Sequence, residues 1–426
     1  FFITNVCNLR FIINMDINDT IFNGRNDLHL EQSINDDANL TISKSCQTRV
    51  VLEEGSELNF KEVPESGELI QKGREIEDYV NGGDVTVERL REYALSEGGF
   101  VNDYLRQRCW PLLIGVPLTG GEPLSSEESL RSHPEYSQVV LDVNRSLKRF
   151  PPGVPYSKRV ALQGQLTNLI LRVITKYPHL RYYQGYHDVA ITFLLVVGED
   201  LAFRIMEKLS THHLRDCMEP TMEKTSHLLN YVYPLVNRVN PRLCTFLDKS
   251  GAGTMFCLPW FLTWFGHSLN HYKDVVRLYD FFLASPPLMS LYLTAAIVTY
   301  RHEDIFSTEC DMASVHCLLS QLPDELPFER LIADAVDLYD SFPPENVEIE
   351  VRERARKEKE ERERAEEEIR RKVNERKKAV TRLNVRAHLE RLVPRSKTQL
   401  VLLAFSIAMG LYAYLRGEGA GDFPIR

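Results

Sequence analysis

The sequence lacks the closely spaced cysteines of a zinc module or a disulfide scaffold. Its eight cysteines are scattered over 426 residues, and no two of them form a C-x-x-C pair. Structural zinc sites bring Cys or His ligands together at short spacing, and small disulfide-stapled folds need a dense cysteine framework. The sequence therefore excludes both classes and predicts reduced, mostly buried thiols in the cytosol.

The sequence also has no excess of basic over acidic residues. The chain carries 51 Lys and Arg against 60 Asp and Glu, which gives a formal net charge of -9. Proteins that bind nucleic acid neutralise its phosphates with a basic surface. We therefore expect no nucleic-acid partner, and any positive patch has to be local.

The histidines do not form a catalytic metal motif. His212 and His213 are adjacent and His187 precedes Asp188, but there is no H-E-x-x-H spacing. Neighbouring side chains on a helix point about 100° apart, so an adjacent pair does not hold one ion. We predict no metal site, and a metal hydrolase stays an alternative that elemental analysis would test.

Composition divides the chain into segments. Residues 1–75 are rich in Asn, Asp, Glu and Ser, which predicts a disordered acidic arm. Residues 76–345 carry apolar residues at helical spacing, broken by Pro and Gly, in runs such as VALQGQLTNLILRVITKYP. These runs seldom alternate with a period of two, so we predict an all-α fold. Its core is expected to include Trp110, Trp260 and Trp264.

A highly charged segment follows at residues 346–397. Opposite charges recur four residues apart, as from Glu358 to Arg362 and from Glu366 to Arg370. This spacing stabilises an exposed helix. Because apolar residues are too sparse for a coiled-coil seam, we favour a solvated rigid spacer over a dimer zipper.

Residues 398–415 contain no charged side chain. Eighteen residues of helix span roughly 27 Å, which matches the thin hydrocarbon core of an early secretory membrane. Arg391, Arg395 and Lys397 precede the segment and favour a cytosolic N-terminal side. We predict a single transmembrane anchor followed by a short luminal tail at residues 416–426, and hence a tail-anchored protein.

Two short polar motifs lie within the helical region. Asp142 and Arg145 in VVLDVNR are one helical turn apart, so the carboxylate can hold the guanidinium by an ion pair. Alone, such a pair is an ordinary surface contact worth less than about 1 kcal/mol. The second motif, RYYQGYHD, places the uncharged Gln184 between Tyr182 and Gly185, directly before an apolar run.

In their order along the chain, the motifs resemble the TBC domain of Rab GTPase-activating proteins. R-x-x-x-W-P-x-x-x-G begins at Arg106, V-x-x-D-x-x-R ends at Arg145, and Y-x-Q-G begins at Tyr182. The resemblance covers about residues 85–330. The motif YYQGYHD, the run RFPPG and the C-terminal anchor look most like membrane-anchored members of the family, whose relatives act at the endoplasmic reticulum to Golgi step. Departures are mild: Val139 replaces a common Ile, and Tyr186-His187 replaces a common Met-Asn.

The resemblance implies an all-helical fold and two catalytic side chains. Arg145 is implied to be an arginine finger and Gln184 a glutamine finger, supported by Asp142, Tyr182 and Gly185. A guanidinium is permanently charged, so it can bind the charge that develops on a departing phosphoryl group. Glutamine can accept from the attacking water and donate to phosphate at once, which orients the nucleophile without deprotonating it. Gly185 is expected to let a partner approach closely and Tyr182 to pack the loop.

Together these features predict an activator of a partner's GTP hydrolysis rather than an enzyme with its own substrate. The expected partner is a GTP-bound Rab of the endoplasmic reticulum to Golgi step. GTP and magnesium belong to that partner, and the chain needs no cofactor of its own. The expected location is the endoplasmic reticulum or early Golgi membrane, with the catalytic domain in the cytosol. The alternative is a non-catalytic, membrane-anchored adaptor that binds Rabs or shapes an organelle.

Overall fold

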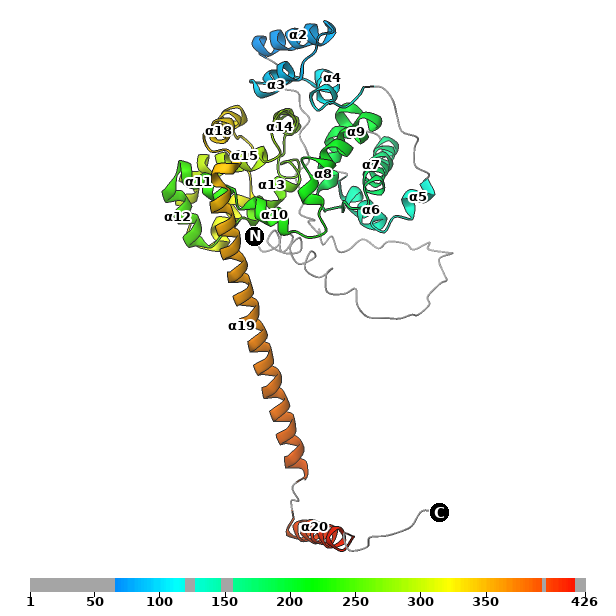
Figure 1. Cartoon of the computed structure of the whole chain (residues 1–426), viewed down its shortest axis with the longest axis vertical. Helices are drawn as coiled ribbons and strands as arrows, with labels where there is room; N and C mark the ends of the chain where they lie inside the picture. The colour runs from blue at the N-terminus through cyan, green and yellow to red at the C-terminus, as the bar shows by residue number, and fades with distance from the viewer. Residues whose placement is uncertain (1–65, 119–126, 147–155, 393–395, 418–426) are drawn as a thin grey trace, which may run out of the picture. The chain divides into compact units, whose positions relative to one another are not determined.

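The computed structural model describes residues 66–118, 127–146, 156–392 and 396–417. Three predictions lie outside these ranges: the arm up to residue 65, the run RFPPG and the tail from residue 418. Within the described ranges the chain is helical and has no strand, which confirms the predicted all-α class (Figure 1). The helices are α2 Gly67–Asn81, α3 Val87–Leu95, α4 Asp103–Leu113, α5 Glu127–Arg131, α6 Tyr136–Arg145, α7 Tyr156–Lys176, α8 Tyr186–Val197, α9 Glu199–Thr211, η2 Arg215–Met218, α10 Glu223–Leu229, α11 Val232–Val239, α12 Pro241–Ser250, η3 Met255–Cys257, α13 Leu258–Leu262, α14 Tyr272–Ala284, α15 Met289–Tyr300, α16 His302–Phe306, α17 Met312–Ser320, α18 Phe328–Ser341, α19 Pro344–Leu392 and α20 Lys397–Gly417.

The chain forms two compact units, Phe1–Glu353 and Arg354–Arg426. In the first unit, α7, α8 and α9 pack against one another and α6 packs on α7 and α8, whereas α15 packs between α11 and α18. Their apolar faces follow from the 3.6-residue spacing read in the sequence. Of the six cysteines in the described ranges, Cys109, Cys217, Cys244 and Cys257 are free and buried, Cys317 is half-buried and Cys310 is exposed, in line with the predicted mostly buried thiols.

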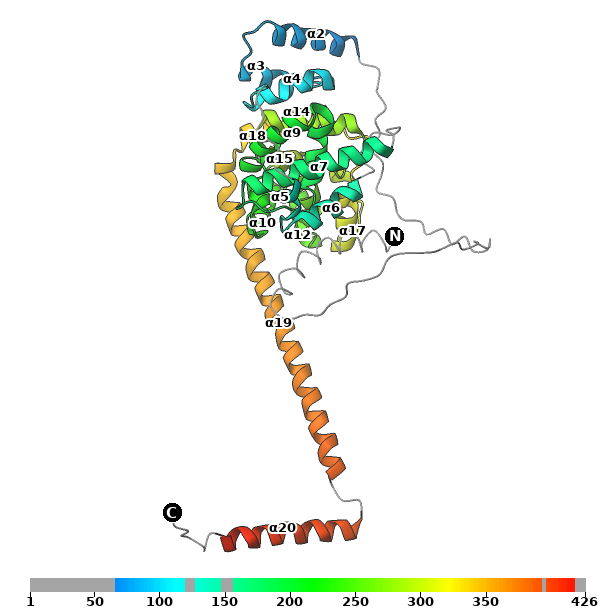
Figure 2. The same ribbon diagram turned by 90° about the vertical axis from the view of Figure 1, so that its right-hand side faces the viewer.

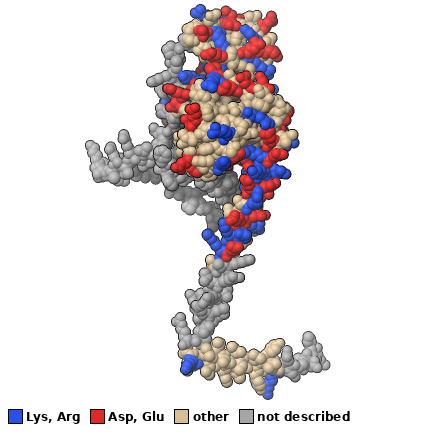
Figure 3. Space-filling view, turned by 90° about the vertical axis from the view of Figure 1, so that its left-hand side faces the viewer, with Lys and Arg blue, Asp and Glu red and all other residues tan. Residues whose placement is uncertain are grey.

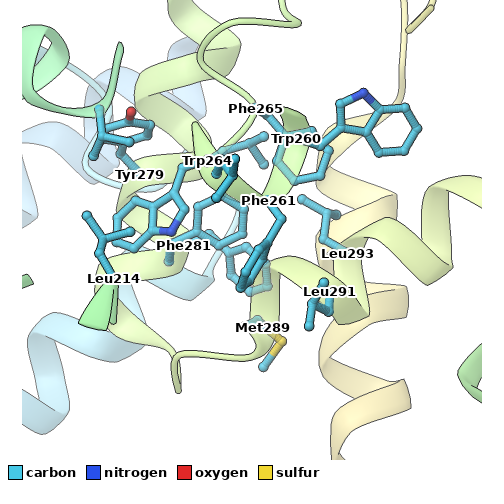
Figure 4. Close-up of a cluster of buried hydrophobic side chains, with 14 of the residues drawn as sticks. Leu214, Trp260, Phe261, Trp264, Phe265, Tyr279, Phe281, Met289, Leu291 and Leu293 are labelled. Atoms are coloured by element: carbon cyan, nitrogen blue, oxygen red, sulfur yellow. The ribbon is translucent and has the colours of Figure 1, made fainter. Parts of the chain in front are cut away.

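Buried aromatic and aliphatic side chains of α13, α14 and α15 form a cluster in this unit (Figure 4). Trp260 on α13 stacks on Phe265 at 5.7 Å between ring centroids, and Trp264 meets the Tyr279 ring of α14 edge-on at 5.5 Å. All three tryptophans are buried, as predicted. Trp264 and Phe265 both have positive φ, at 48° and 63°. This left-handed backbone is costly for bulky residues, so their burial has to hold the turn in place.

Helices α3 and α4 pack on α14, and α2 packs on the outer side of α4 (Figure 2). The contact centres on Asp280 of α14, which is fully buried. Its carboxylate accepts from the Arg106 Nε at 3.1 Å and from the Trp110 Nε1 at 2.7 Å, both from α4. It also accepts from the Phe100 backbone N–H at 3.0 Å. Two residues of the motif that begins at Arg106 thus connect α4 to α14, about 170 residues later in the chain, by buried hydrogen bonds.

Helix α2 begins at Gly67, inside the segment predicted as a disordered arm. The Ser66 hydroxyl caps it by accepting from the Leu69 N–H at 3.3 Å, and Ile76 on its inner face is fully buried. Lys72 adds a bond to the Glu97 carbonyl at 2.6 Å. The helical region therefore starts earlier than the predicted residue 76. This polar segment folds because Ile76 is buried and Lys72 bonds to the backbone after α3.

Helix α19 starts within the first unit and not beyond it. Val347 and Val351 are fully buried, Glu348 accepts from the Tyr231 hydroxyl, and Glu350 pairs with Arg238. The helical domain thus extends to about Glu353, past the boundary predicted at residue 345. Farther along, α19 carries ion pairs four residues apart, as expected of an exposed charged helix.

Helix α20 is the one described helix that is long and apolar enough to cross a membrane. Its side chains are exposed along its length, and its charged residues lie only at its ends (Figure 3). It contains the whole segment predicted as an anchor, residues 398–415. These properties are compatible with a membrane anchor.

Candidate functional site

Arg145 is the last residue of α6, and its side chain points away from the core. The side chain is 68% exposed, whereas that of Asp142, one turn earlier, is only 1% exposed. The Arg145 Nη1 lies 3.7 Å from the Asp142 Oδ1. Asp142 is buried because it shares the inner face of α6 with Val139 and Val143. The two partners therefore differ: the carboxylate is buried, whereas the guanidinium is exposed to solvent and only loosely paired.

The Asp142 carboxylate joins the arginine motif to the glutamine motif. Its Oδ2 accepts from the Tyr182 hydroxyl at 3.0 Å and from the Gln138 Nε2 at 3.1 Å. The Tyr182 backbone N–H also donates to the Glu135 Oε2 at 3.2 Å, just before α6. Two hydrogen bonds to carboxylate oxygens, both donated by Tyr182, thus join motifs that lie about 40 residues apart in the chain.

The Tyr182 hydroxyl also contacts His187, with 2.9 Å between the oxygen and Nδ1. A hydroxyl has one proton, and this one goes to Asp142, so the His187 Nδ1–H donates to the Tyr182 oxygen. Burial raises the pKa of Tyr182 well above its ordinary value, and the nearby Asp142 charge raises it further. The phenol therefore stays protonated at neutral pH, and its bond to Asp142 persists.

The loop that carries Gln184 packs against the last residue of α13, Leu262, and the residue after it, Thr263. The Tyr183 hydroxyl donates to the Leu262 carbonyl at 2.9 Å. Gly185 has φ 108°, and a Cβ at this position would lie 2.9 Å from the Thr263 Cγ2. Gln184 is half-buried, and no other described residue hydrogen-bonds to its amide. The loop is thus rigid where Gly185 meets Thr263, which leaves the Gln184 amide available to a partner.

The first turn of α8 follows this loop directly. Asp188 lies there with its carboxylate 3.7 Å from the His187 Nε2 and 3.2 Å from the Nδ1 of the largely exposed His267. A carboxylate in a first turn is stabilised by the helix dipole. In the part of the chain that the structure describes, no group of three His, Cys, Asp or Glu side chains is arranged to hold a metal. The contacts of Asp188 with His187 and His267 instead stabilise the start of α8, directly after the Gln184 loop.

Sequence reasoning found the exposed Arg145 but missed most of what surrounds it. Glu135, Gln138 and Thr263 were not singled out, although each contacts the motif residues. The four-residue spacing from Gln138 to Asp142 could have indicated one of these contacts. Nothing in the sequence indicates that Thr263 lies under Gly185, because that contact depends on how α13 packs.

The hydroxyl of Tyr182 is expected to contribute to stability. In a Tyr182→Phe variant, Asp142 loses a donor while remaining buried, so the free energy of unfolding should fall by roughly 1–3 kcal/mol. Urea denaturation of a fragment spanning residues 66–353 would measure this change. Tyr156→Phe is the matched control, because Tyr156 is 80% exposed and should show little change. Equal stability of the two variants would show that the hydrogen bond from Tyr182 to Asp142 does not stabilise the domain.

Gly185 should tolerate no side chain. Gly185→Ala combines a left-handed backbone with a methyl group that meets Thr263, which should cost roughly 1–3 kcal/mol. In Gly185→Ala/Thr263→Ser the Cγ2 is gone, but the hydroxyl that donates to the Pro259 carbonyl is kept. This double variant should recover part of the loss. No recovery in thermal or urea unfolding would show that the backbone conformation alone makes glycine necessary.

The chain is similar to proteins of one known family. The family model of the Rab-GTPase-TBC domain matches residues 103–306. TBC1 domain family member 20 of Homo sapiens is 50% identical over 274 residues, covering 64% of this chain and 68% of that protein. The GTPase-activating protein gyp10 of Schizosaccharomyces pombe is 33% identical over 250 residues, covering 58% of this chain and 66% of that protein.

A solved structure has the same fold. The crystal structure of the Ypt/Rab-GAP domain of Gyp1p matches with a TM-score of 0.53 at 15% identity, covering 64% of this chain and 99% of that domain. At this identity the match supports the fold alone. Because half of the aligned residues are identical over 68% of a TBC protein, this chain belongs to the Rab-GTPase-TBC domain family.

Proposed function

We propose that this chain is a GTPase-activating protein for a Rab of the early secretory pathway, and that it acts through Arg145 and Gln184. The observation that carries the proposal is the Asp142 carboxylate, which lies 3.7 Å from the Arg145 guanidinium and accepts from Tyr182 at 3.0 Å. One buried group thereby supports both motifs. An activator needs this arrangement because its two fingers have to meet a single phosphate.

Arg145 would act on the charge of the transition state. GTP hydrolysis spreads negative charge over the phosphoryl oxygens, and an isolated GTPase neutralises this charge poorly. The exposed guanidinium can enter a partner's nucleotide site, while Asp142 fixes the turn from which it projects. Because the pair distance is long and the side chain is exposed, Arg145 can leave Asp142 at little cost. Asp142 then keeps its bonds from Tyr182 and Gln138.

Gln184 would orient the attacking water. Its amide has a donor and an acceptor on one planar group, so it can contact the water and a phosphate oxygen together. The Gly185 turn and the Tyr183 bond to Leu262 hold the loop in one conformation, which lowers the entropy lost on binding. GTP and magnesium would come with the Rab, and the activator would supply no cofactor.

Helix α20 would anchor the activator in the membrane that carries the Rab. Its length suits a thin bilayer such as that of the endoplasmic reticulum or early Golgi. Two proteins held on one bilayer meet at a raised effective concentration, so a modest intrinsic affinity suffices. The catalytic domain would then lie on the cytosolic side.

The test is single-turnover GTP hydrolysis by a panel of Rabs, with and without the fragment 66–353. These bounds keep α2 and the buried start of α19, both of which belong to the first unit. We expect strong acceleration for at least one Rab of the early secretory pathway. Binding to Rabs without acceleration of any of them would overturn catalysis and favour the adaptor.

A further inference from the structure

The part of α19 in the second unit, residues 354–392, has two halves that differ in charge. Residues 354–368 carry six Lys and Arg and seven Glu, so this half is close to neutral. The second half, residues 369–392, has two acidic residues, Glu375 and Glu390. Its basic residues number nine: Arg370, Arg371, Lys372, Arg376, Lys377, Lys378, Arg382, Arg386 and Arg391. A spacer needs no such asymmetry, since mixed charges suffice to keep a helix in solution.

An apolar stripe runs along the same half of the helix. Ile369, Val373 and Val380 are 62%, 43% and 57% exposed, although exposure of branched apolar side chains is unfavourable. At about 100° per residue these three positions fall within roughly 40° of one another around the helix axis. Over residues 369–380, one face of a mostly charged helix is therefore apolar and exposed.

Basic residues border this stripe on both sides. Lys372 and Arg376 lie on one side and Arg370 and Lys377 on the other, all within about 80° of its centre. Glu375 lies roughly 140° away, on the opposite face. An apolar stripe flanked by cations is typical of helices that lie in the interface of an anionic membrane. The apolar side chains enter the headgroup boundary while the flanking cations meet lipid phosphates.

The charges argue against a second copy of the chain as the occupant of the stripe. If the stripe were the seam of a parallel coiled coil, Lys372 of one copy would face Lys377 of the other. Like charges at these positions are destabilising. The stripe is also close in sequence to the candidate membrane helix, because only residues 393–396 separate α19 from α20.

We propose that residues 369–380 of α19 form a membrane-surface helix that binds anionic lipid headgroups through its basic borders and the acyl boundary through Ile369, Val373 and Val380. The proposal rests on the membrane anchoring proposed above and is independent of GTPase activation. A single span fixes the chain to any bilayer, whereas the basic borders add a preference for anionic lipid. Residues 369–380 then act as a surface-bound segment and not as an upright spacer.

The full-length chain can test this in vesicles by tryptophan quenching. Val373→Trp places a reporter in the stripe, and Asn374→Trp places a matched reporter about 100° away. The native tryptophans are buried and contribute a constant background. In vesicles of phosphatidylserine and brominated phosphatidylcholine we expect quenching of the Val373→Trp reporter but not of the Asn374→Trp reporter. Without phosphatidylserine the quenching should fall to a small fraction.

Charge variants separate the basic borders from overall charge. Changing Arg370, Lys372, Arg376 and Lys377 to Gln should weaken surface binding by roughly five-fold for each residue. The control changes Arg356, Lys357, Lys359 and Arg362 to Gln, which alters the net charge equally in the other half of the helix. The control should keep the quenching of the Val373→Trp reporter.

Each outcome decides one question. Equal quenching at positions 373 and 374, or none at either in anionic vesicles, would overturn the surface contact. Cross-linked dimers with the stripe shielded in neutral vesicles would instead assign it to a second copy. Release of the chain from vesicles by alkaline carbonate would overturn the anchor and this inference together. GTP hydrolysis by a Rab measured in the same vesicles reports on the proposed function separately.

Discussion

Replacing Arg145 by alanine should lower the stimulated rate of GTP hydrolysis by roughly 10³- to 10⁵-fold, the range expected for loss of an arginine finger. The side chain is 68% exposed and its contact with Asp142 is long, so the free energy of unfolding should change by less than about 1 kcal/mol. Single-turnover hydrolysis with the responsive Rab measures the first quantity. Urea denaturation of the fragment 66–353 measures the second.

Two companion variants sharpen this result. Arg145→Lys keeps the charge but loses the planar fork, so it should recover only a small part of the rate. Gln184→Ala should also slow the reaction, by roughly 10²-fold, because the water loses its orienting group. A rate that is unchanged in Arg145→Ala would refute the proposed mechanism, because no other part of the proposal supplies a permanent positive charge.

Replacing Asp280 by alanine should destabilise the domain by roughly 3–5 kcal/mol, because Arg106 would be left buried without its main counter-charge. The Trp110 indole and the Phe100 N–H would lose their acceptor as well. The loss is thus larger than that of one hydrogen bond. The measurement is again urea denaturation of the fragment 66–353. The dependence of the unfolding free energy on urea concentration should be the same in the variant and the unmodified fragment.

The control for Asp280 is a carboxylate whose ion pair is exposed. Glu92 pairs with Arg89 at 2.6 Å, and both side chains are largely exposed. Glu92→Ala should therefore cost less than about 1 kcal/mol. If Asp280→Ala and Glu92→Ala lowered the free energy of unfolding equally, burial would not explain how much the Asp280 contacts stabilise the domain.

The helical class and the long apolar helix near the C-terminus could be predicted because both depend on local patterns. A 3.6-residue period defines a buried face wherever it occurs, and an uncharged run of eighteen residues is long enough to span a bilayer. The ion pair between Asp142 and Arg145 was also predictable, because one turn of helix brings them together. Burial of the three tryptophans followed from their apolar surroundings in the sequence.

The ends of the helical domain were harder to predict. Gly67–Asn81 and the start of α19 are polar in composition, and they look like a disordered arm and a free rod. They fold onto the domain because a few side chains, such as Ile76, Val347 and Val351, meet apolar faces contributed by distant segments. A window of sequence does not contain those faces.

The sequence by itself determined which side chains are available: a permanent cation at Arg145, a neutral amide at Gln184, a glycine at Gly185 and an apolar helix near the C-terminus. Only the tertiary structure decided that Asp142 is buried, that the Tyr182 hydroxyl bonds to it, and that Thr263 leaves no room for a Cβ at Gly185. The physical reason is that helix formation depends on neighbours within a turn, whereas these contacts join residues about 40 and 80 positions apart and exist only when α6, α8 and α13 pack together.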